Sequence, residues 1–179
     1  MATQLQTFAA LSLASLLLEE FERELPTTRK FLERVPDDQL LWQPHEKSLT
    51  AGQLALHIAM SPQGVIGLAT PDEAAIPEFG GGFPQPQSIQ EVLDALEQGS
   101  QVVQGYLSTV SDERLLQTLT LTFAGKPLLT MPRHLFLRNI LLNHWYHHRG
   151  QLGVYLRLLG AKVPSSYGPS GDEKPDFLP

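Results

Sequence analysis

Two histidines in the segment LLNHWYHHRGQLGVYLRLLG, residues 141–160, have the spacing of a helical metal site. His144 and His148 are four residues apart. On an α-helix this places their side chains one above the other, with Cβ atoms about 5–6 Å apart. Both imidazoles can therefore reach one metal ion. His57, in the helical-looking segment TAGQLALHIAM at residues 50–60, is the natural third ligand. We predict that two helices bring these three histidines together.

A seam of the last predicted helix supports this interpretation. Taken in alternating steps of four and three, the seam reads Leu137, Leu141, His144, His148, Gln151, Tyr155 and Leu158. This spacing is typical of a helix facing a bundle core. The ends of the seam are apolar and its middle is polar, and burying these polar groups costs several kcal/mol unless each finds a partner. A metal ion would satisfy the imidazoles, and Gln151, one turn beyond, could hydrogen-bond a metal-bound water or a substrate as a candidate catalytic residue. Tyr155 could line the pocket, although a packed aromatic is the more common role at such a position.

The choice of ligands has alternatives. His147 lies three residues after His144 and could share its face, although His148 continues the seam through Gln151 and is preferred. A lone histidine on an apolar face, such as His57, is more often a hydrogen-bonded core residue than a ligand.

Three other polar residues near these segments are assigned no chemistry. His45 falls in a predicted loop, and His134 is ten residues before the pair, off the seam. Arg149 points about 100° away from the preceding histidine, so we expect a salt bridge or a partner contact there.

The donor set restricts the metal and the reaction. The chain has no cysteine, which excludes disulfides, thiolate ligands and a cysteine nucleophile. Three neutral imidazoles without a carboxylate suit zinc, nickel or ferrous iron better than magnesium or calcium. Three protein ligands leave a coordination position open, as in catalytic sites. The metal could then lower the pKa of a bound water for hydrolysis, or ionise a low-molecular-weight thiol for transfer.

The composition fits one cytoplasmic domain. The chain has 179 residues and a net charge of −6, which argues against nucleic acid and anionic membranes as partners. The apolar segment FAALSLASLLL, residues 8–18, is not preceded by Lys or Arg and is too short to cross a membrane. We interpret it as the buried face of the first helix.

Helix signals divide the first half of the chain. Apolar periodicity predicts a helix over residues 2–24, which Pro26 should end or kink before one or two further turns. Thr50 followed by Gln53 is a capping box that starts the second helix. Pro62, with a glycine two residues later, should weaken that helix and kink it near the site.

The segment 70–87 is rich in proline and glycine and is predicted to lack regular structure, as a disordered surface loop or a lid over the site. Ser88 with Glu91 is a second capping box, which opens a third helix through about residue 109. Ser111 begins a short fourth helical piece.

The second half of the chain completes the bundle. Residues 118–123 alternate as a strand and predict a small β-hairpin that decorates the bundle without forming a sheet. Thr130 should cap the last long helix, and Gly160 should end it. The expected fold is therefore an all-α four-helix bundle with long connecting loops, over residues 1–163, followed by an extended C-terminal tail over 164–179.

Two segments resemble a known family. HHRGQLGVYLRLLGAKVPSSYGPSGDE, residues 147–173, is similar to the end of DinB-like proteins, and WQPHEKSLTAGQLALHIA, residues 42–59, is similar to their second helix region. This superfamily includes YfiT-type metal-dependent hydrolases and bacillithiol or mycothiol S-transferases. The resemblance implies a DinB-type four-helix bundle, metal ligands at His57, His144 and His148, and a homodimer. It does not fix the reaction.

The favoured hypothesis is a metal-dependent enzyme that acts on a small molecule in a pocket at the centre of the bundle, as a hydrolase or a thiol S-transferase. The alternative is a non-enzymatic dimeric bundle, such as a sensor or a stress-related structural protein, that binds a metal or another ligand. A third possibility is a bundle that retains the three histidines without using them.

Overall fold

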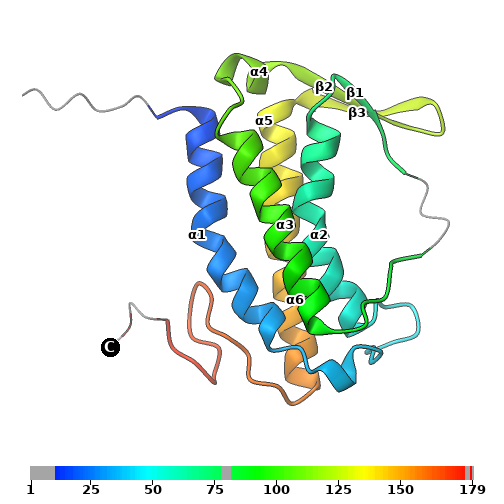
Figure 1. Ribbon diagram of the computed structural model, residues 1–179, viewed down its shortest axis with the longest axis vertical. Coiled ribbons are helices and arrows are strands. Elements are labelled where there is room, and N and C mark those ends of the chain that lie inside the picture. Colours follow the sequence, from blue (N-terminus) through cyan, green and yellow to red (C-terminus); the bar gives the residue numbers. More distant parts are fainter. Residues whose placement is uncertain (1–10, 78–81, 176–177, 179) are drawn as a thin grey trace, which may run out of the picture.

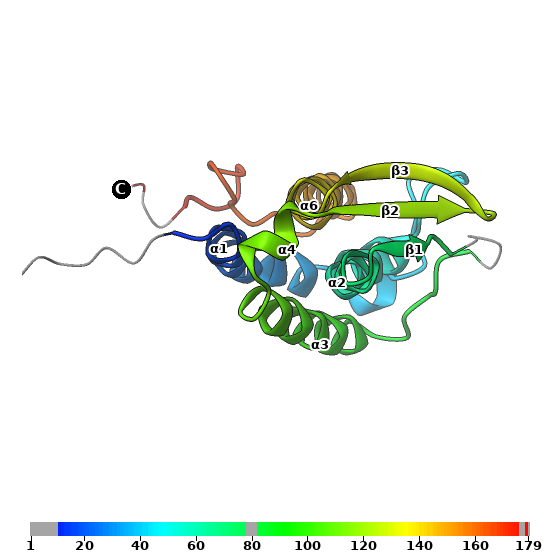
Figure 2. The same ribbon diagram turned by 90° about the horizontal axis from the view of Figure 1, so that it is seen from above.

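Four long helical segments lie side by side in the computed structural model, which describes residues 11–77, 82–175 and 178 (Figure 1). They are α1 (Leu13–Glu33), α2 (Ala51–Ala69), α3 (Ile89–Leu107) and a last helix made of α5 (Arg133–Phe136), η2 (Leu137–Asn143) and α6 (His144–Leu158). Seen end-on, α1 and α2 occupy opposite corners, and each packs against both α3 and α6 (Figure 2). The predicted four-helix bundle is confirmed.

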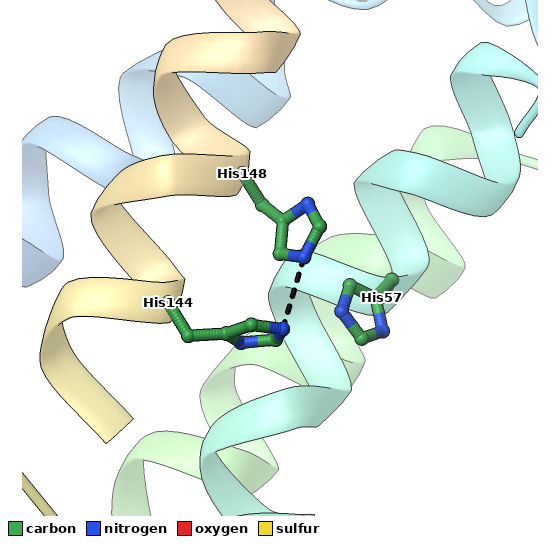
Figure 3. Close-up of side chains that lie close together, drawn as sticks. All are labelled: His57, His144 and His148. Atoms are coloured by element: carbon green, nitrogen blue, oxygen red, sulfur yellow. Dashed lines mark hydrogen bonds between the residues drawn. The ribbon is translucent and has the colours of Figure 1, made fainter. Parts of the chain in front are cut away.

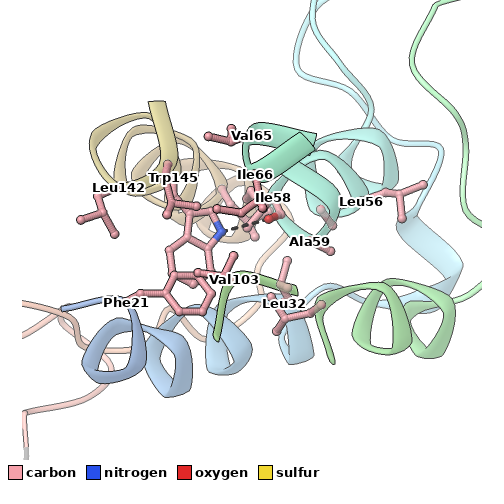
Figure 4. Close-up of a cluster of buried hydrophobic side chains, with 14 of the residues drawn as sticks. Phe21, Leu32, Leu56, Ile58, Ala59, Val65, Ile66, Val103, Leu142 and Trp145 are labelled. Atoms are coloured by element: carbon pink, nitrogen blue, oxygen red, sulfur yellow. Dashed lines mark hydrogen bonds between the residues drawn. The ribbon is translucent and has the colours of Figure 1, made fainter. Parts of the chain in front are cut away.

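The core lies between these helices and is apolar. It includes the buried side chains drawn in Figure 4, among them Phe21, Leu32, Ile58, Ile66, Val103 and Trp145. Phe21 of α1 stacks on Trp145 of α6 with ring centroids 5.0 Å apart. Contacts of this kind bury apolar area from all four helices and account for most of the stability of such a bundle.

The first helix passes through its proline. Within the described residues α1 begins at Leu13, because the Ser12 hydroxyl caps it, and the predicted start near residue 2 lies outside them. Pro26 lies inside α1 and does not end it. Phe31 and Leu32, beyond the proline, are buried, and their packing offsets the lost helix hydrogen bond.

Capping residues start the next two helices as predicted. The Thr50 hydroxyl accepts from the Gln53 N–H at 3.1 Å, and the Gln53 side chain accepts from the Thr50 N–H at 3.0 Å. Ser88 likewise caps α3 through the Glu91 N–H. Pro62 does not end α2, which continues past it to Ala69, and the predicted kink there stays a prediction.

The long connection from α2 to α3 follows from helix direction. Both helices run upward in Figure 1, so the chain must return along the bundle before α3 can start. The prediction that this connection lacks regular structure is wrong, because β1 (Glu73–Ala75) lies within it.

A small sheet closes one end of the bundle. It consists of β1, β2 (Thr118–Phe123) and β3 (Lys126–Pro132), in the order β1-β2-β3. The predicted hairpin is confirmed as β2 and β3, which are antiparallel. The expectation that it would stand outside any sheet is wrong, because β1 adds in parallel to β2. The hairpin turns at Ala124 and Gly125, with φ of 48° and 74°, the left-handed conformations that tight hairpin turns need.

The last helix starts later than predicted. Thr130 is in β3, opposite Thr120, and so does not cap it. The helix begins at Arg133, after the short helix α4 (Asp112–Leu116) and the hairpin. The Arg133 side chain is fully buried and donates to the Ala69 carbonyl at 2.6 Å and to Asp72 at 2.9 Å. This arginine ties the end of α2 to the start of the last helix.

The last helix changes its hydrogen-bond pattern before the histidine pair. η2 is a π-helix, and its closing bond runs from the His144 N–H to the Asn139 carbonyl, five residues back. Its wider turn changes the face that the following residues present. The helix ends before Gly160, whose φ is +72°, as predicted.

The tail after the last helix packs on the bundle. Residues 161–175 form no helix or strand and run between α1 and α6 (Figure 2). Arg157 pairs with Asp172 at 2.7 Å, and Arg34, the C-cap residue of α1, pairs with Glu173 at 2.6 Å. Among the residues that the structure describes, none of the helices combines the length and the apolar character that a membrane crossing requires.

Candidate metal centre

The three predicted histidines meet between α2 and α6. One ring nitrogen from each of His57, His144 and His148 lies within 4.8 Å of the other two. The rings gather in the space between the two helices (Figure 3), and the Nε2 atoms of His144 and His148 are 3.0 Å apart. Ring centroids are separated by 4.3–5.2 Å. The arrangement fits three nitrogen donors around one ion.

The cluster lies at the edge of the core and not at its centre. The buried face of α6 carries Trp145 and Leu156, while His144 and His148 flank it and are half-buried. Leu158, which closes the predicted seam, is 59% exposed. The expected pocket at the bundle centre is therefore corrected to a partly open site between α2 and α6.

Burial keeps the three imidazoles neutral. It lowers the pKa of His57 to about 4, and the neighbouring rings of His148 and His144 contribute to this shift. Burial and the same kind of repulsion bring the pKa of His144 to about 4. Burial also lowers the pKa of His148, against a hydrogen bond to Gln151 that raises it. Neutral rings have the free lone pairs that metal binding needs.

Gln151 orients one of these rings. Its Oε1 is 3.0 Å from Nδ1 of His148. Because the amide oxygen can only accept, Nδ1 carries the proton and Nε2 presents its lone pair toward the other two histidines. The structure engages the Gln151 oxygen with the His148 ring, and the predicted contact of Gln151 with a metal-bound water or a substrate stays a prediction. Nδ1 of His144 is buried and has no hydrogen-bond partner within the described part of the chain.

The remaining histidines lie outside the cluster. His147 is exposed, and its ring centroid lies 4.9 Å from that of His148. His45 is exposed in the loop before α2, and Nδ1 of His134 is 3.2 Å from the Leu115 carbonyl. The geometry thus favours His148 over His147 as the third member of the cluster.

An aromatic residue that the sequence did not single out borders the site. The Phe83 ring contacts the His57 ring edge to face, with centroids 5.3 Å apart. The Gln53 side chain, one turn before His57, donates to the Phe83 carbonyl at 3.0 Å. Phe83 follows a glycine run within the long connection, and nothing in its local sequence indicates this contact.

The segment that carries Phe83 is attached to the start of α2. The Thr50 hydroxyl donates to Oε1 of Gln85 at 2.7 Å, and Nε2 of Gln85 donates to the Leu40 carbonyl at 3.2 Å. The Gln85 amide fills the space beside Gly52, where a Cβ would lie 2.5 Å from its nitrogen. A glycine is needed at this position for the segment to approach.

Arg149 forms the salt bridge that its position predicted. It pairs with Glu24 of α1 at 2.7 Å, and both side chains are nearly buried. Thr28 and the Tyr167 hydroxyl complete its contacts at 3.2 and 2.9 Å. The ring centroids of Tyr146 and Tyr167 each lie 5.3 Å from the guanidinium carbon of Arg149. This network joins α1, α6 and the tail, and it is structural.

Comparison with known proteins identifies the family. Three crystal structures of DinB-like proteins resemble this fold. The protein from Bacillus cereus ATCC 10987 has a TM-score of 0.67 at 26% identity, over 84% of this chain and 95% of that one. The one from Exiguobacterium sibiricum 255-15 has 0.68 at 23%, over 88% and 99%. One from Bacillus subtilis has 0.65 at 19%, over 84% and 96%. The latter two show the fold alone.

Sequence comparison agrees. The uncharacterized protein YrdA of Bacillus subtilis (strain 168) is 30% identical over 161 residues, covering 89% of this chain and 91% of its own. The model of the DinB family matches residues 1–175. The chain therefore belongs to the DinB family.

Proposed function

We propose that His57, His144 and His148 bind a divalent metal ion. The observation that carries this proposal is the convergence of three imidazole nitrogens within 4.8 Å. Nitrogen ligands lie about 2.0–2.1 Å from a zinc ion, which places neighbouring donor nitrogens roughly 3–3.5 Å apart. The 3.0 Å between the Nε2 atoms of His144 and His148 fits this spacing. The structure joins these two atoms by a hydrogen bond, and a bound cation would take the place of the proton between them.

The donor set points to the metal. Three neutral nitrogens without a carboxylate favour zinc or nickel, and ferrous iron is also compatible. Among the described residues, the cluster that could hold the ion consists of three histidines and includes no carboxylate. The positive charge of a bound ion would therefore stay largely uncompensated by the protein and would favour an anionic nucleophile.

We infer that the site serves an enzyme acting on a small molecule. A metal held by three histidines supplies a Lewis acid with an open position, for water in a hydrolase or for a low-molecular-weight thiol in an S-transferase. Gln151 holds the His148 ring in the ligating tautomer and keeps its amide N–H groups for a substrate. Phe83 forms an apolar wall beside His57. The homodimer and the cytoplasmic location stay predictions.

Metal analysis tests the first part of the proposal. Protein purified without a histidine tag should contain stoichiometric metal, and His144→Ala should lose it. His147→Ala is the matched control, since it removes a neighbouring exposed imidazole and should keep the metal. Only traces of metal, unchanged by His144→Ala, would exclude the site.

Turnover assays test the second part. Metal-loaded protein should turn over a member of an ester and amide panel, or transfer a thiol to an electrophile panel, and His57→Ala should abolish this. No turnover on either panel, together with a large loss of thermal stability on chelation, would assign the metal a structural role.

A further inference from the structure

The Ile58 carbonyl in the middle of α2 lacks its helical donor. In an α-helix the carbonyl of residue i accepts from the N–H of residue i+4. For Ile58 that residue is Pro62, which has no N–H. Ile58 is fully buried, so water cannot replace the donor. A buried carbonyl without a partner costs about 1–3 kcal/mol.

Trp145 of α6 supplies the missing donor. Its indole Nε1–H donates to the Ile58 carbonyl at 2.9 Å, in the core between the two helices (Figure 4). The Ser61 hydroxyl lies 3.5 Å from the same oxygen, at the limit of a hydrogen bond. Trp145 is 1% exposed, and Phe21 stacks against its ring. The indole is therefore held in one orientation.

This bond lies directly beside the candidate metal centre. Ile58 follows His57 in α2, and Trp145 follows His144 in α6. Neighbouring residues of a helix keep a fixed rise and rotation. A bond that fixes the axial position of Ile58 relative to Trp145 therefore also fixes the axial position of His57 relative to His144.

Apolar packing alone defines the axial register of α2 against α6 less precisely than this hydrogen bond does. Interlocking apolar side chains also resist a slide of one helix along another, but their attraction is non-directional. A hydrogen bond weakens steeply with poor geometry. The Trp145–Ile58 bond thus opposes a slide that would separate His57 from the pair.

We propose that Trp145 is a positioning residue of the metal centre. By donating to the carbonyl that Pro62 frees, it fixes the axial register of α2 against α6. This inference rests on the proposed metal site for its effect on binding, whereas the freed carbonyl can be tested without metal.

The test uses Trp145→Phe, Pro62→Ala and the double variant. The free energy of unfolding of metal-free protein is measured by urea titration, and zinc affinity by competition with a chromophoric chelator. Trp145→Phe should lower the stability, because it leaves the Ile58 carbonyl unpaired. It should also weaken zinc binding about tenfold or more, the usual effect of removing a group that holds ligands in place.

The double variant separates positioning from stability. The Pro62→Ala substitution restores an N–H that can bond the Ile58 carbonyl within α2. Trp145→Phe should therefore lower the free energy of unfolding less in the Pro62→Ala background than in the wild type. The bond between helices remains absent, so zinc affinity should stay low. Leu115→Ala is the control, since this fully buried residue lies in α4, outside the two helices that the bond joins, and its loss should lower stability without weakening zinc binding.

Three outcomes would overturn the proposal. In the first, zinc affinity is unchanged in Trp145→Phe. In the second, zinc affinity recovers along with stability in the double variant. In the third, Trp145→Phe costs as much free energy of unfolding in the Pro62→Ala background as in the wild type. The first two remove the positioning role, and the third removes the freed carbonyl. If the wild-type protein binds no zinc, nickel or iron, the proposed function itself fails, and the positioning role fails with it.

Discussion

Replacing Gly52 with alanine should detach the segment that carries Phe83. Gly52 is the second residue of α2, and an added Cβ would lie 2.5 Å from Nε2 of Gln85 and 2.9 Å from the Leu40 carbonyl oxygen. The Gln85 side-chain amide can rotate away from the added Cβ. The Leu40 carbonyl belongs to the backbone and accepts from the Gly52 N–H at 2.9 Å, so it cannot move without losing that bond.

The size of the effect follows from two opposing contributions. Displacing the Gln85 amide removes its bonds to Thr50 and Leu40, worth about 0.5–1.5 kcal/mol each. Alanine in place of glycine inside a helix contributes about 0.5–1 kcal/mol of stability. Together with the clash against the Leu40 carbonyl, the losses exceed the gain, so Gly52→Ala should lower the free energy of unfolding by up to about 2 kcal/mol.

A second glycine of the same helix is the matched control. Gly67 is exposed, and a Cβ added there would meet no heavy atom within 4 Å. Gly67→Ala should therefore raise the free energy of unfolding by about 0.5–1 kcal/mol, opposite in sign to Gly52→Ala. Urea unfolding followed by circular dichroism measures both. The reasoning fails if Gly52→Ala stabilises the protein as Gly67→Ala does.

Three further predictions concern the buried charges and the histidine cluster. Glu24→Ala should lower the free energy of unfolding by about 3–5 kcal/mol, because Arg149 is left buried without its partner, and Glu24→Gln should cost less in the same urea titration. Gln151→Ala should weaken zinc binding about tenfold or more, while Gln151→Glu, which still accepts from His148, should retain it in a chelator competition. The pKa of His57 is about 4 in the fold and 6.5 ordinarily, so between these pH values the unfolded chain binds more protons and the stability of metal-free protein should fall as pH drops. His57→Gln should reduce this fall in melting experiments, and an identical pH dependence in both proteins would contradict the shift.

The sequence by itself determined the features that depend on neighbours along the chain. The capping box at Thr50 and the N-cap hydroxyl of Ser88 start helices where they were expected. The spacing of His144 and His148 places both rings on one side of α6, because helix geometry alone sets that relation. Gly160 ends the last helix because its positive φ suits glycine.

Only the tertiary structure decided the features that depend on distant partners. The π-helix before His144 changes the face that the following residues present, and the histidines in the middle of the predicted seam lie at the edge of the core. Pro62 has the local signature of a helix breaker, yet Trp145 of a different helix supplies the donor that the proline lacks. Phe83 reaches His57 through a segment whose hydrogen bonds go to the start of α2. Local patterns record the periodicity of one element, whereas these contacts depend on how two elements are packed, and packing is set by the whole core.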